Sequence, residues 1–511
     1  MAELRFDSFP VLEGEQINAL VDEFLQRVQD DLAKQTRGLN PKAREQREAD
    51  YLVLIKQILS ALYSAYFTMP VGTGRVALPL RASAYKRSTK RPDKIPFSYR
   101  YTLNLKDLLV SMGWIDSEDG AIGKYTRIWA ANDLERRFKR IGFKWHAQRL
   151  SPPETLVVLR DLDPSSKGRR KRNKITLPTP ATPEVQEYQE NLFRINSVLT
   201  QHCISLDLDD NHLDRMLMEW TSGPLDAEGD TEDDDQQVEP GSIDLNSVQL
   251  TRIFARGSLT KGGRFYRAWW QGIPSRHRPH IRIDGLKTVE VDYSAVGIRI
   301  IYAKLGHPYP ESEDPYDLGL PPWDGETGKD PRRTIVKQFL NALINDEKGN
   351  YRLDKERQAV LGITHNELIN LVKERHEPIM DSFSTGIGLE AQFMDSQIAE
   401  GVMNRLMSFM EEPVVVLPIH DSFIVKVGDQ RLLETAMKDV FKELTGSSSS
   451  VTRTGIKVNK HYGLSMEDVD NLPIKDQIQS QHELKEIMKQ VNSFMGRYVR
   501  SWEQWKANSE V

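Results

Sequence analysis

Hydrophobic residues at three- and four-residue spacing open the chain and predict a helical N-terminal region over residues 1–66. The clearest stretches are DEFLQRVQDDLAKQ at 22–35 and DYLVLIKQILSALYSAYF at 50–67. Near residue 67 the pattern breaks in TMPVGTGRVALPL, whose Pro and Gly residues are typical of turns. A new structural unit is therefore expected to begin there.

The next pattern, over residues 67–160, predicts a small winged-helix-like unit. An amphipathic helix, LKDLLVSMGWI, precedes a polar turn that contains Gly. A short strand, YTRIWA, and a second helix that starts at the Asn132–Asp133 cap follow it. Helix, turn, β-wing and helix form the outline of a common nucleic-acid reader. Many small α+β units share this outline, so a purely structural unit is the alternative.

Residues 161–250 predict a helical segment between two charged linkers. The stretch 161–182 is polar and Pro-rich, and its KGRRKRNK run at 167–174 carries six bases and no acid. A helix is expected over 183–222. It contains the acids Asp207, Asp209 and Asp210, which are either metal ligands or residues that favour a helix N-terminus. The run at 226–239 has eight acids and no base, and marks the clearest boundary in the chain.

Composition narrows the class of protein. The 511 residues are 39% hydrophobic and 28% charged, with a mean hydropathy of −0.53, and no stretch is apolar enough for a membrane span. The N-terminus lacks the apolar core of a signal peptide, and one cysteine, Cys203, excludes a disulfide framework or a cysteine-rich zinc site. A cytoplasmic protein, in a bacterium or a phage-infected host, is expected. Residues 251–300 carry ten Lys and Arg against three acids, which favours a polyanionic partner.

Two aspartates lie at the ends of predicted strands after residue 250. TVEVDYSAVGIRIIYAKLG (288–306) reads as a buried strand followed by a helix, so Asp292 stands at a strand end. PVVVLPIHDSFIVKV (413–427) reads as two apolar strands with His420–Asp421 at the turn between them. Either aspartate alone is an ordinary turn residue. Together, on adjacent strands, they suit a site for two Mg²⁺ ions that catalyses phosphoryl transfer.

Between these strands, DPRRTIVKQFLNALIN (330–345) predicts a helix that starts at Asp330–Pro331. Arg333 and Lys337 are four residues apart and therefore share one face. Fixed cations on one helix face can bind a triphosphate. A solvated basic face opposite an apolar one is the alternative.

The order of these segments resembles that of family A DNA polymerases and the phage- or mitochondrial-type single-subunit RNA polymerases. Five segments carry the resemblance, in this order: KGGRFYRAWWQGIP with Arg264, DYSAVGIRI with Asp292, EDPYDL, RRTIVKQFLNALIN with Arg333 and Lys337, and IHDSFIV with His420 and Asp421. The resemblance implies a mixed α+β fold, with a right-hand polymerase palm and fingers at 251–470, a mainly helical N-terminal half and a C-terminal helical tail at 471–511. It also implies two Mg²⁺ ions, nucleoside triphosphates, and a DNA template with a primer or nascent RNA as partners, beside accessory replication or transcription proteins.

The family's motifs assign further roles to single residues. Asp292 and Asp421 would hold the metal ions, and Arg333 and Lys337 the triphosphate. Nucleic acid would contact four residues: Arg264, Arg299, His420 and Gln392. Gln392 belongs to DSFSTGIGLEAQFMDSQIAEGVMNRLMSFM (381–410), which reads as a loop and a long helix.

Departures from the family pattern bear on the choice of nucleotide. DNA polymerases of the family carry Glu five residues after the first aspartate, whereas this chain has Gly297, as the RNA polymerases do. A missing side chain leaves room for a 2′-OH. Ser422 and Phe423 after Asp421 also match the RNA polymerases, whereas Arg299 matches the DNA polymerases. Asn345 replaces the family's Tyr, and is a candidate to hydrogen-bond a 2′-OH.

These observations predict a small single-subunit RNA polymerase or primer-synthesising polymerase of a phage, plasmid or mobile element. The alternatives are a family A-like DNA polymerase without proofreading, since residues 1–250 show no exonuclease strand with spaced carboxylates, and a replication or regulatory nucleic-acid-binding protein with a decayed site. Asn345 in place of the family's Tyr favours the alternative of a decayed site, whereas the intact Asp292 and Asp421 oppose it.

Overall fold

The computed structural model describes most of the chain between residues 18 and 454. The described ranges are 4–5, 18–27, 37–38, 40–68, 74–78, 99–120, 126–141, 150–164, 174–208, 216, 245, 247–321, 323, 330–346, 351–408 and 413–454. Several sequence predictions lie outside them. These are Asp209 and Asp210, most of the basic run at 167–174, the acidic run at 226–239, and the tail at 471–511.

The chain is a mixed helix-and-sheet protein. Its helices are α2 (Pro41–Thr68), α3 (Tyr99–Ser111), α4 (Asn132–Ile141), α5 (Pro183–Leu199), α7 (Val296–Lys304), α8 (Arg332–Asn345), α9 (Lys355–Leu361), α10 (His365–Arg375), α11 (Ile387–Met403) and α12 (Gln430–Thr445). Its strands are β1 (Leu4–Arg5), β2 (Val76–Leu78), β3 (Ile115–Glu118), β4 (Thr126–Ala130), β5 (Val157–Leu162), β6 (Lys174–Leu177), β7 (Ile204–Leu206), β8 (Thr251–Phe254), β9 (Gly262–Tyr266), β10 (Ile281–Ile283), β11 (Leu286–Tyr293), β12 (Leu417–Ile419), β13 (Ser422–Lys426) and β14 (Val451–Thr454).

The central sheet has the strand order β12-β13-β11-β10-β7, and β14 also pairs with β11. The predicted strand ending at Asp292 and the predicted hairpin around His420–Asp421 are both confirmed, as β11 and as β12–β13. β11 is antiparallel to β13 and to β14, which lie on its two sides. Because β11 is paired along both edges, its end is a rigid position for a side chain that binds a ligand.

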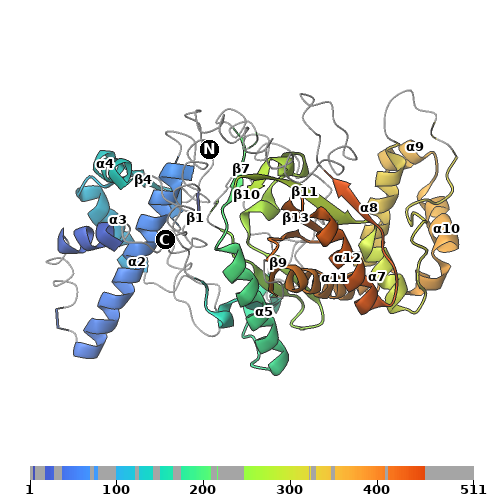
Figure 1. Ribbon diagram of the computed structural model, residues 1–511, viewed down its shortest axis with the longest axis horizontal. Helices are drawn as coiled ribbons and strands as arrows, with labels where there is room; N and C mark the ends of the chain where they lie inside the picture. Colours follow the sequence, from blue (N-terminus) through green and yellow to red (C-terminus); the bar gives the residue numbers. More distant parts are fainter. Residues whose placement is uncertain are drawn as a thin grey trace.

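Helices pack around this sheet, and α11 has the most contacts with other elements among those described below. Figure 1 shows α11 and α12 beside the sheet, with α8, α9 and α10 toward one end of the elongated molecule and α2, α3 and α4 at the other. α11 contacts β9, α7, α8 and α12. Most of its residues are buried, as expected for a helix that is covered on several sides.

A second sheet, β6-β5-β8-β9, links the two halves of the chain. β5 pairs with β8 in parallel, and β6 pairs with β5. The polar stretch at 161–182, which the sequence predicts to be a linker, therefore contains the end of β5 and all of β6. Main-chain pairing explains the difference, since β5 pairs with β8 from a distant part of the chain and β6 pairs with β5.

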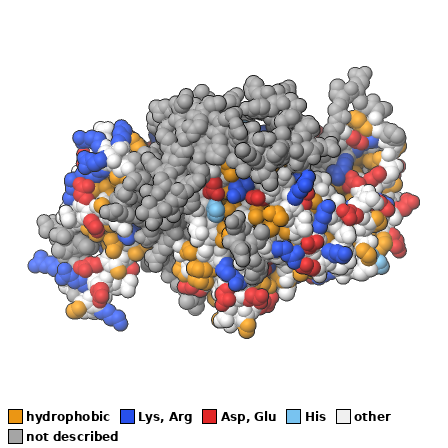
Figure 2. All heavy atoms as spheres, viewed as in Figure 1, with side chains coloured by type: hydrophobic (Ala, Val, Ile, Leu, Met, Phe, Trp, Pro, Cys, Tyr) orange, Lys and Arg blue, Asp and Glu red, His pale blue; other side chains and the backbone are white. Residues whose placement is uncertain are grey.

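The predicted wing of the N-terminal unit belongs to a four-stranded sheet with the order β1-β2-β4-β3. α3, the β3–β4 pair and α4 follow one another, and Trp114 packs against Phe24 at a centroid distance of 5.3 Å. Figure 2 shows Lys and Arg side chains over this end of the molecule. On α4, Arg136 and Lys139 are exposed but pair with Asp133 and Glu135 of the same helix. α3, β3, β4 and α4 occur in the predicted order, whereas the winged-helix-like character of the unit and its binding to nucleic acid stay predictions.

The helix predicted over 183–222 is shorter than expected. α5 ends at Leu199, and residues 204–206 form β7, which pairs antiparallel with β10. Asp207 follows this strand and forms an ion pair with Arg282 of β10. The interpretation of Asp207 as a residue at a helix N-terminus is therefore wrong. The pairing of β7 with β10 and the ion pair with buried Arg282 determine its position.

Among the residues that the structure describes, no helix is long and apolar enough to cross a membrane.

Candidate active site

The two aspartates singled out by the sequence lie side by side at the ends of neighbouring strands in the central sheet. Asp292 is directly opposite Ser422 in the β11–β13 ladder, and the backbone N–H of Tyr293 donates to the carbonyl of Asp421 at 3.3 Å. Asp421 follows His420, whose φ of 56° closes the two-residue turn between β12 and β13. The hairpin therefore brings Asp421 beside the end of β11.

The surroundings of Asp292 disfavour its ionised form. Burial raises the pKa of the Asp292 carboxyl above its usual range, and the negative charge of Asp421 raises it further. Glu290 acts in the same direction, whereas the positive charges of Lys337 and Arg278 lower the pKa. Two carboxylates that repel one another in a partly buried site are typical of a site that binds a cation.

Sequence reasoning missed a third carboxylate, that of Glu290. Its Oε1 accepts a hydrogen bond from Arg278 Nη1 at 2.8 Å and another from Ser422 Oγ at 2.6 Å. Glu290 and Asp292 are two residues apart on one strand and so share a face of the sheet. That spacing in VEVDY was the available signal. Arg278 neutralises Glu290, and Ser422 fixes it to the neighbouring strand.

The predicted basic face of the 330–345 helix points toward this pair. Arg333 Nε donates to Asp314 Oδ2 at 2.5 Å and Nη2 to Asp314 Oδ1 at 3.1 Å. Its guanidinium lies 5.2 Å from the ring centroid of Tyr316. Lys337, one turn further along α8, is exposed, and its charge acts on Asp292. The opposite face of α8 is buried, as the apolar pattern predicted.

The turn that carries Asp314 and Tyr316 completes the site. Burial raises the pKa of the Tyr316 hydroxyl, and the charges of Asp421 and Asp292 raise it further, while Arg333 lowers it. The phenol of Tyr316 is therefore protonated at neutral pH and available as a hydrogen-bond donor beside the two aspartates. The segment EDPYDL thus supplies a tyrosine to the site and an aspartate that orients Arg333.

Arg299 does not occupy the position that the sequence assigned to it. It is 97% buried, with an exposed fraction of 3%. Its guanidinium donates to the carbonyls of Pro310, Glu311 and Glu313 at 3.0, 3.2 and 2.8 Å. Nε donates to the carbonyl of Ser294 at 3.0 Å. The prediction that Arg299 contacts nucleic acid is corrected here, because backbone carbonyls occupy its donors and burial removes it from the surface.

The turn at 309–316, whose carbonyls bind Arg299, is also held by His376. Buried His376 hydrogen-bonds through Nε2 to the carbonyl of Pro315 at 3.0 Å and through Nδ1 to the hydroxyl of Tyr302 at 3.0 Å. Burial lowers the pKa of His376 to about 4, so the ring is neutral at physiological pH and donates one proton only. Arg299 and His376 together fix the turn that leads to Tyr316.

We expect Arg299→Met to destabilise the protein by about 3 kcal/mol or more, because several buried carbonyls lose their donor. Incorporation should fall as the turn with Asp314 and Tyr316 loosens. Thermal unfolding and a nucleotide-incorporation assay measure the two effects, and the salt dependence of DNA binding tests for a phosphate contact. Arg299→Met, which removes the cation, should leave the slope of log K for DNA binding against log salt unchanged. A slope reduced by about one would instead indicate a phosphate contact and contradict the structural role.

Gly297, at the start of α7, lies in open space. A Cβ placed on this residue has no atom of the described chain within 4 Å. Close packing of a strand against this helix, which would also require glycine, therefore has no support in the described part of the chain. Its proposed role at the sugar stays a prediction.

Four of the remaining predicted residues, Arg264, His420, Gln392 and Asn345, belong to β9 or α11 or have neighbours there. The ring of His420 contacts that of Tyr266 at a centroid distance of 5.7 Å. Arg264 Nε donates to Asp395 Oδ2 of α11 at 2.8 Å, and both side chains are largely buried. Gln392 and Asn345 line a pocket with Tyr266. Nucleic-acid contacts of Arg264, His420 and Gln392 remain predictions.

The residues present fit Mg²⁺ through carboxylate oxygens. No group of three or more His, Cys, Asp or Glu side chains that could hold a metal occurs within the described ranges. Mg²⁺, however, is commonly bound by one or two carboxylates together with substrate phosphates and water. Asp292 and Asp421 provide two hard oxygen donors whose mutual repulsion a divalent cation would relieve, so these two residues would hold it.

Comparison with known proteins gives limited information. No protein-family model matches the chain, and no curated protein matches its sequence. Among solved structures, the POL domain of Pol1 from M. smegmatis, in complex with DNA primer-template and dNTP, matches with 16% identity and a TM-score of 0.29. The match covers 41% of this chain and 48% of that one, so the chain spans about half of the matched structure. This TM-score is too low to establish a shared fold.

Proposed function

We propose that this chain is a template-directed nucleotidyltransferase, in the class of small single-subunit RNA polymerases or primer-synthesising polymerases. The observation that supports it best is the pair Asp292 and Asp421 on adjacent strands, with Lys337 acting on it from a helix that also carries Arg333. Paired carboxylates and facing cations suit a nucleoside triphosphate with its metal ions. The proposed setting is a phage, plasmid or mobile element.

In this proposal, each group of the site has one task. When bound, Mg²⁺ would act as a Lewis acid for the transferred phosphoryl group. Asp292 and Asp421 hold negative charge at fixed positions on the sheet. Lys337 and Arg333 bind phosphate oxygens, and Asp314 keeps the Arg333 fork in one orientation. The protonated Tyr316 hydroxyl donates to an oxygen beside the aspartates.

The residues around Asp292 and Asp421 limit the negative charge of the site. Glu290 would add a third negative charge at the site, but Arg278 pairs with it at 2.8 Å. Ser422 donates to the same carboxylate and ties β13 to β11. The site therefore has two charged carboxylates at fixed positions, and the third carboxylate, that of Glu290, is neutralised by Arg278.

The two alternative functions differ in what supports them. The DNA-polymerase alternative rested on the sequence match of Arg299 to the motif of those enzymes, and the burial of Arg299 under the 309–316 turn does not test that match. The alternative of a decayed nucleic-acid-binding protein rested on Asn345. The intact set of Asp292, Asp421, Lys337 and Arg333 weighs against it.

A primer-extension assay with labelled nucleotides separates the three functions. The full chain is incubated with Mg²⁺ and a template, with or without a preformed primer, and with rNTPs or dNTPs. We expect extension with rNTPs. Extension with dNTPs alone would favour the DNA-polymerase alternative, and no product under any condition would favour a decayed site.

Sugar selection is tested at Gly297. Gly297→Ala should be tolerated or stabilise α7 by about 0.5–1 kcal/mol, since Ala has the higher helix propensity and the space is open. Gly297→Glu should reduce rNTP incorporation about 10- to 100-fold relative to dNTPs, because overpacking of the sugar costs about 1–3 kcal/mol. The measurement is the ratio of kcat/KM for a matched rNTP and dNTP. An equal loss for both would contradict the proposed role.

A further inference from the structure

The segment between β9 and β10 contacts both strands on which the proposed site is built. It contains two short 3₁₀ helices, η5 (Trp269–Gly272) and η6 (Ser275–His280). η5 contacts β12, the strand before Asp421, and η6 contacts β11, the strand that contains Asp292. This segment is therefore placed to fix the β12–β13 hairpin relative to β11.

The turn that carries Asp421 has a backbone conformation that needs such support. His420 has a φ of 56°, in the left-handed region that residues other than glycine adopt infrequently. Such a conformation persists where neighbouring groups fix it, and it is common at functional sites. The groups that hold the two arms of this turn are therefore candidates for residues that position Asp421.

η5 holds the arm before the turn. The carbonyl of Pro418 accepts hydrogen bonds from Trp270 Nε1 and from Gln271 Nε2, both at 3.2 Å. Gln271 Nε2 also donates to the carbonyl of Phe265 at 2.8 Å, so this amide joins β9 to β12. Trp270 and Gln271 are both buried, and water is a poor substitute for a partner in such a place.

η6 holds the arm after the turn through an intermediate carboxylate. Arg278 Nη1 donates to Glu290 Oε1 at 2.8 Å, and Arg278 Nε donates to the carbonyl of Ile273 at 3.1 Å. The same Glu290 Oε1 accepts from Ser422 Oγ at 2.6 Å. Ser422 directly follows Asp421, so one carboxylate oxygen joins Arg278 to the base of the turn.

These contacts are largely shielded from water. The side chains of Arg278 and Glu290 are 20% and 11% exposed, and Ser422 is 5% exposed. A hydroxyl has one proton, so the short bond from Ser422 Oγ to a carboxylate is favoured over its 3.2 Å contact with the carbonyl of Ile419. Without Arg278, Glu290 would lose its cation, and we expect its carboxylate to turn toward water and release Ser422.

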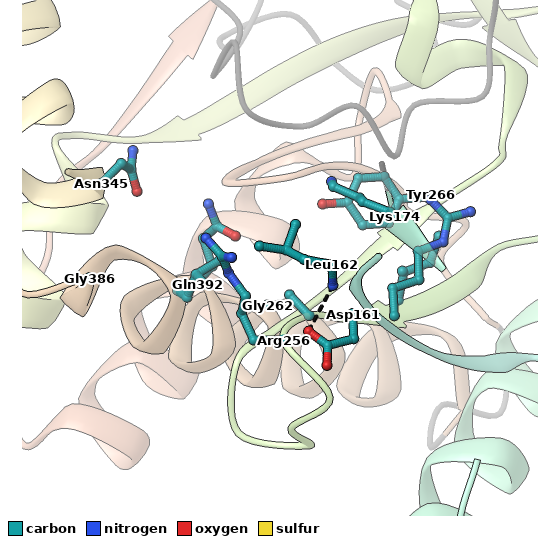
Figure 3. Close-up of a pocket in the computed structure, with 13 residues that line it drawn as sticks. Asp161, Leu162, Lys174, Arg256, Gly262, Tyr266, Asn345, Gly386 and Gln392 are labelled. Atoms are coloured by element: carbon teal, nitrogen blue, oxygen red, sulfur yellow. Dashed lines mark hydrogen bonds between the residues drawn. The ribbon is translucent and has the colours of Figure 1, made fainter. Parts of the chain in front are cut away.

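A third support for the turn comes from β9. The ring of Tyr266 contacts that of His420 at a centroid distance of 5.7 Å. Figure 3 shows Tyr266 at one end of a pocket and Asn345, the last residue of α8, at the other. The main neighbours of α8 are α9 and α11. The groups that fix the turn are therefore separate from the helix that carries Arg333 and Lys337.

We propose that Arg278 is a positioning residue for nucleotidyl transfer, which acts through Glu290 and Ser422 to hold Asp421 beside the end of β11. This inference rests on the proposed function, because the position of Asp421 affects a reaction only if the reaction occurs there. Misplacement of a reacting group by about 1 Å can cost roughly 100-fold in rate. A displaced turn would also loosen the 3.3 Å bond between the N–H of Tyr293 and the carbonyl of Asp421.

Four variants and one control test this role in the full chain. Ser422→Ala removes the link, and Ser422→Thr keeps the hydroxyl. Arg278→Met removes the cation, and the double variant Arg278→Met/Glu290→Gln also removes the charge that is left behind. The control is Arg453→Met, because Arg453 of β14 forms a similarly shielded ion pair with Glu434 and its strand also pairs with β11.

We expect Ser422→Ala and Arg278→Met to lower kcat for incorporation about 10- to 100-fold and to leave KM for the nucleotide within about threefold. Ser422→Thr should retain at least about a third of the wild-type kcat, since threonine suits a strand and keeps the donor. The double variant should be more active than Arg278→Met, because glutamine needs no cation and its oxygen still accepts from Ser422. Arg453→Met should match the wild type.

Two kinetic results would overturn the proposal. One is a kcat equal to that of the wild type in Ser422→Ala and Arg278→Met. The other is a double variant no more active than Arg278→Met, with a loss that Arg453→Met shares, since this would indicate a general contribution to stability rather than positioning.

Hydrogen exchange measured by mass spectrometry tests the hairpin without nucleotide, Mg²⁺ or catalysis. The peptide 417–426 should exchange about tenfold faster in Ser422→Ala and Arg278→Met than in the wild type, whereas exchange in α5 should be unchanged. If the wild type incorporates no nucleotide but this peptide exchanges faster in the variants, the proposed function is wrong and the hold of Arg278 on the hairpin stands. Unchanged exchange of the peptide in both variants would refute the positioning role, whether or not the wild type incorporates nucleotides.

Discussion

Asp292→Asn or Asp421→Asn should each reduce nucleotide incorporation at least about a thousandfold. A metal-holding carboxylate contributes several kcal/mol of charge stabilisation in the transition state, and each 1.4 kcal/mol is a factor of ten in rate. Binding to primer–template should stay within about threefold of the wild type, because neither substitution removes a cation. Single-turnover incorporation and fluorescence anisotropy measure the two quantities.

Asp292→Asn should also stabilise the protein in the absence of divalent cations. Burial and the charge of Asp421 raise the pKa of Asp292, so its ionised form costs stability at neutral pH. The neutral amide removes that cost, and Tm should rise by about 1 °C for each kcal/mol of repulsion relieved in a chain of this length.

Asp429→Asn is the matched control. Burial raises the pKa of this carboxyl too, at the start of α12, but it has no part in the site. It should leave incorporation unchanged. If Asp292→Asn and Asp421→Asn were as active as Asp429→Asn, the assignment of the catalytic pair would be wrong.

The second large effect is expected on the cationic face of α8. Arg333→Ala and Lys337→Ala should each lower kcat/KM for the nucleotide about 10- to 100-fold, since a hydrogen bond to a charged group is worth about 1.5–3 kcal/mol. Arg333→Lys should recover only part of the loss, because lysine cannot reproduce the two-donor fork that Asp314 orients.

Lys373→Ala on α10 is the control, since Lys373 is an exposed lysine of the same helical region. Steady-state kinetics at saturating primer–template give the values. Full activity of both α8 variants would mean that this face is merely solvated, which is the alternative that the sequence left open.

The strand positions of Asp292 and Asp421 were predictable because local patterns determine them. An apolar run before Asp292, and two apolar runs around His420–Asp421, each suffice to define a strand or a hairpin. The face of α8 with Arg333 and Lys337 followed from helical spacing in the same way.

Contacts between distant segments were not predictable from such patterns. Nothing in the spacing around Arg299 shows that it binds carbonyls in the 310–313 segment, because backbone acceptors carry no sequence signal. Asp207 and Arg282 are 75 residues apart, and their pairing needed the β7–β10 ladder. A short apolar run such as Cys203–Leu206 reads as helix or strand, and only its partner decides between them.

The most direct test of the central claim is whether the template base decides which nucleotide is added. Four primer–templates that differ only in the first unpaired template base are each incubated with the wild-type chain, Mg²⁺ and one labelled nucleotide at a time. The expected result is addition of the complementary nucleotide on each template, with none by Asp421→Asn. Addition that ignores the template base, or no addition by the wild type, would contradict template-directed nucleotidyl transfer at Asp292 and Asp421.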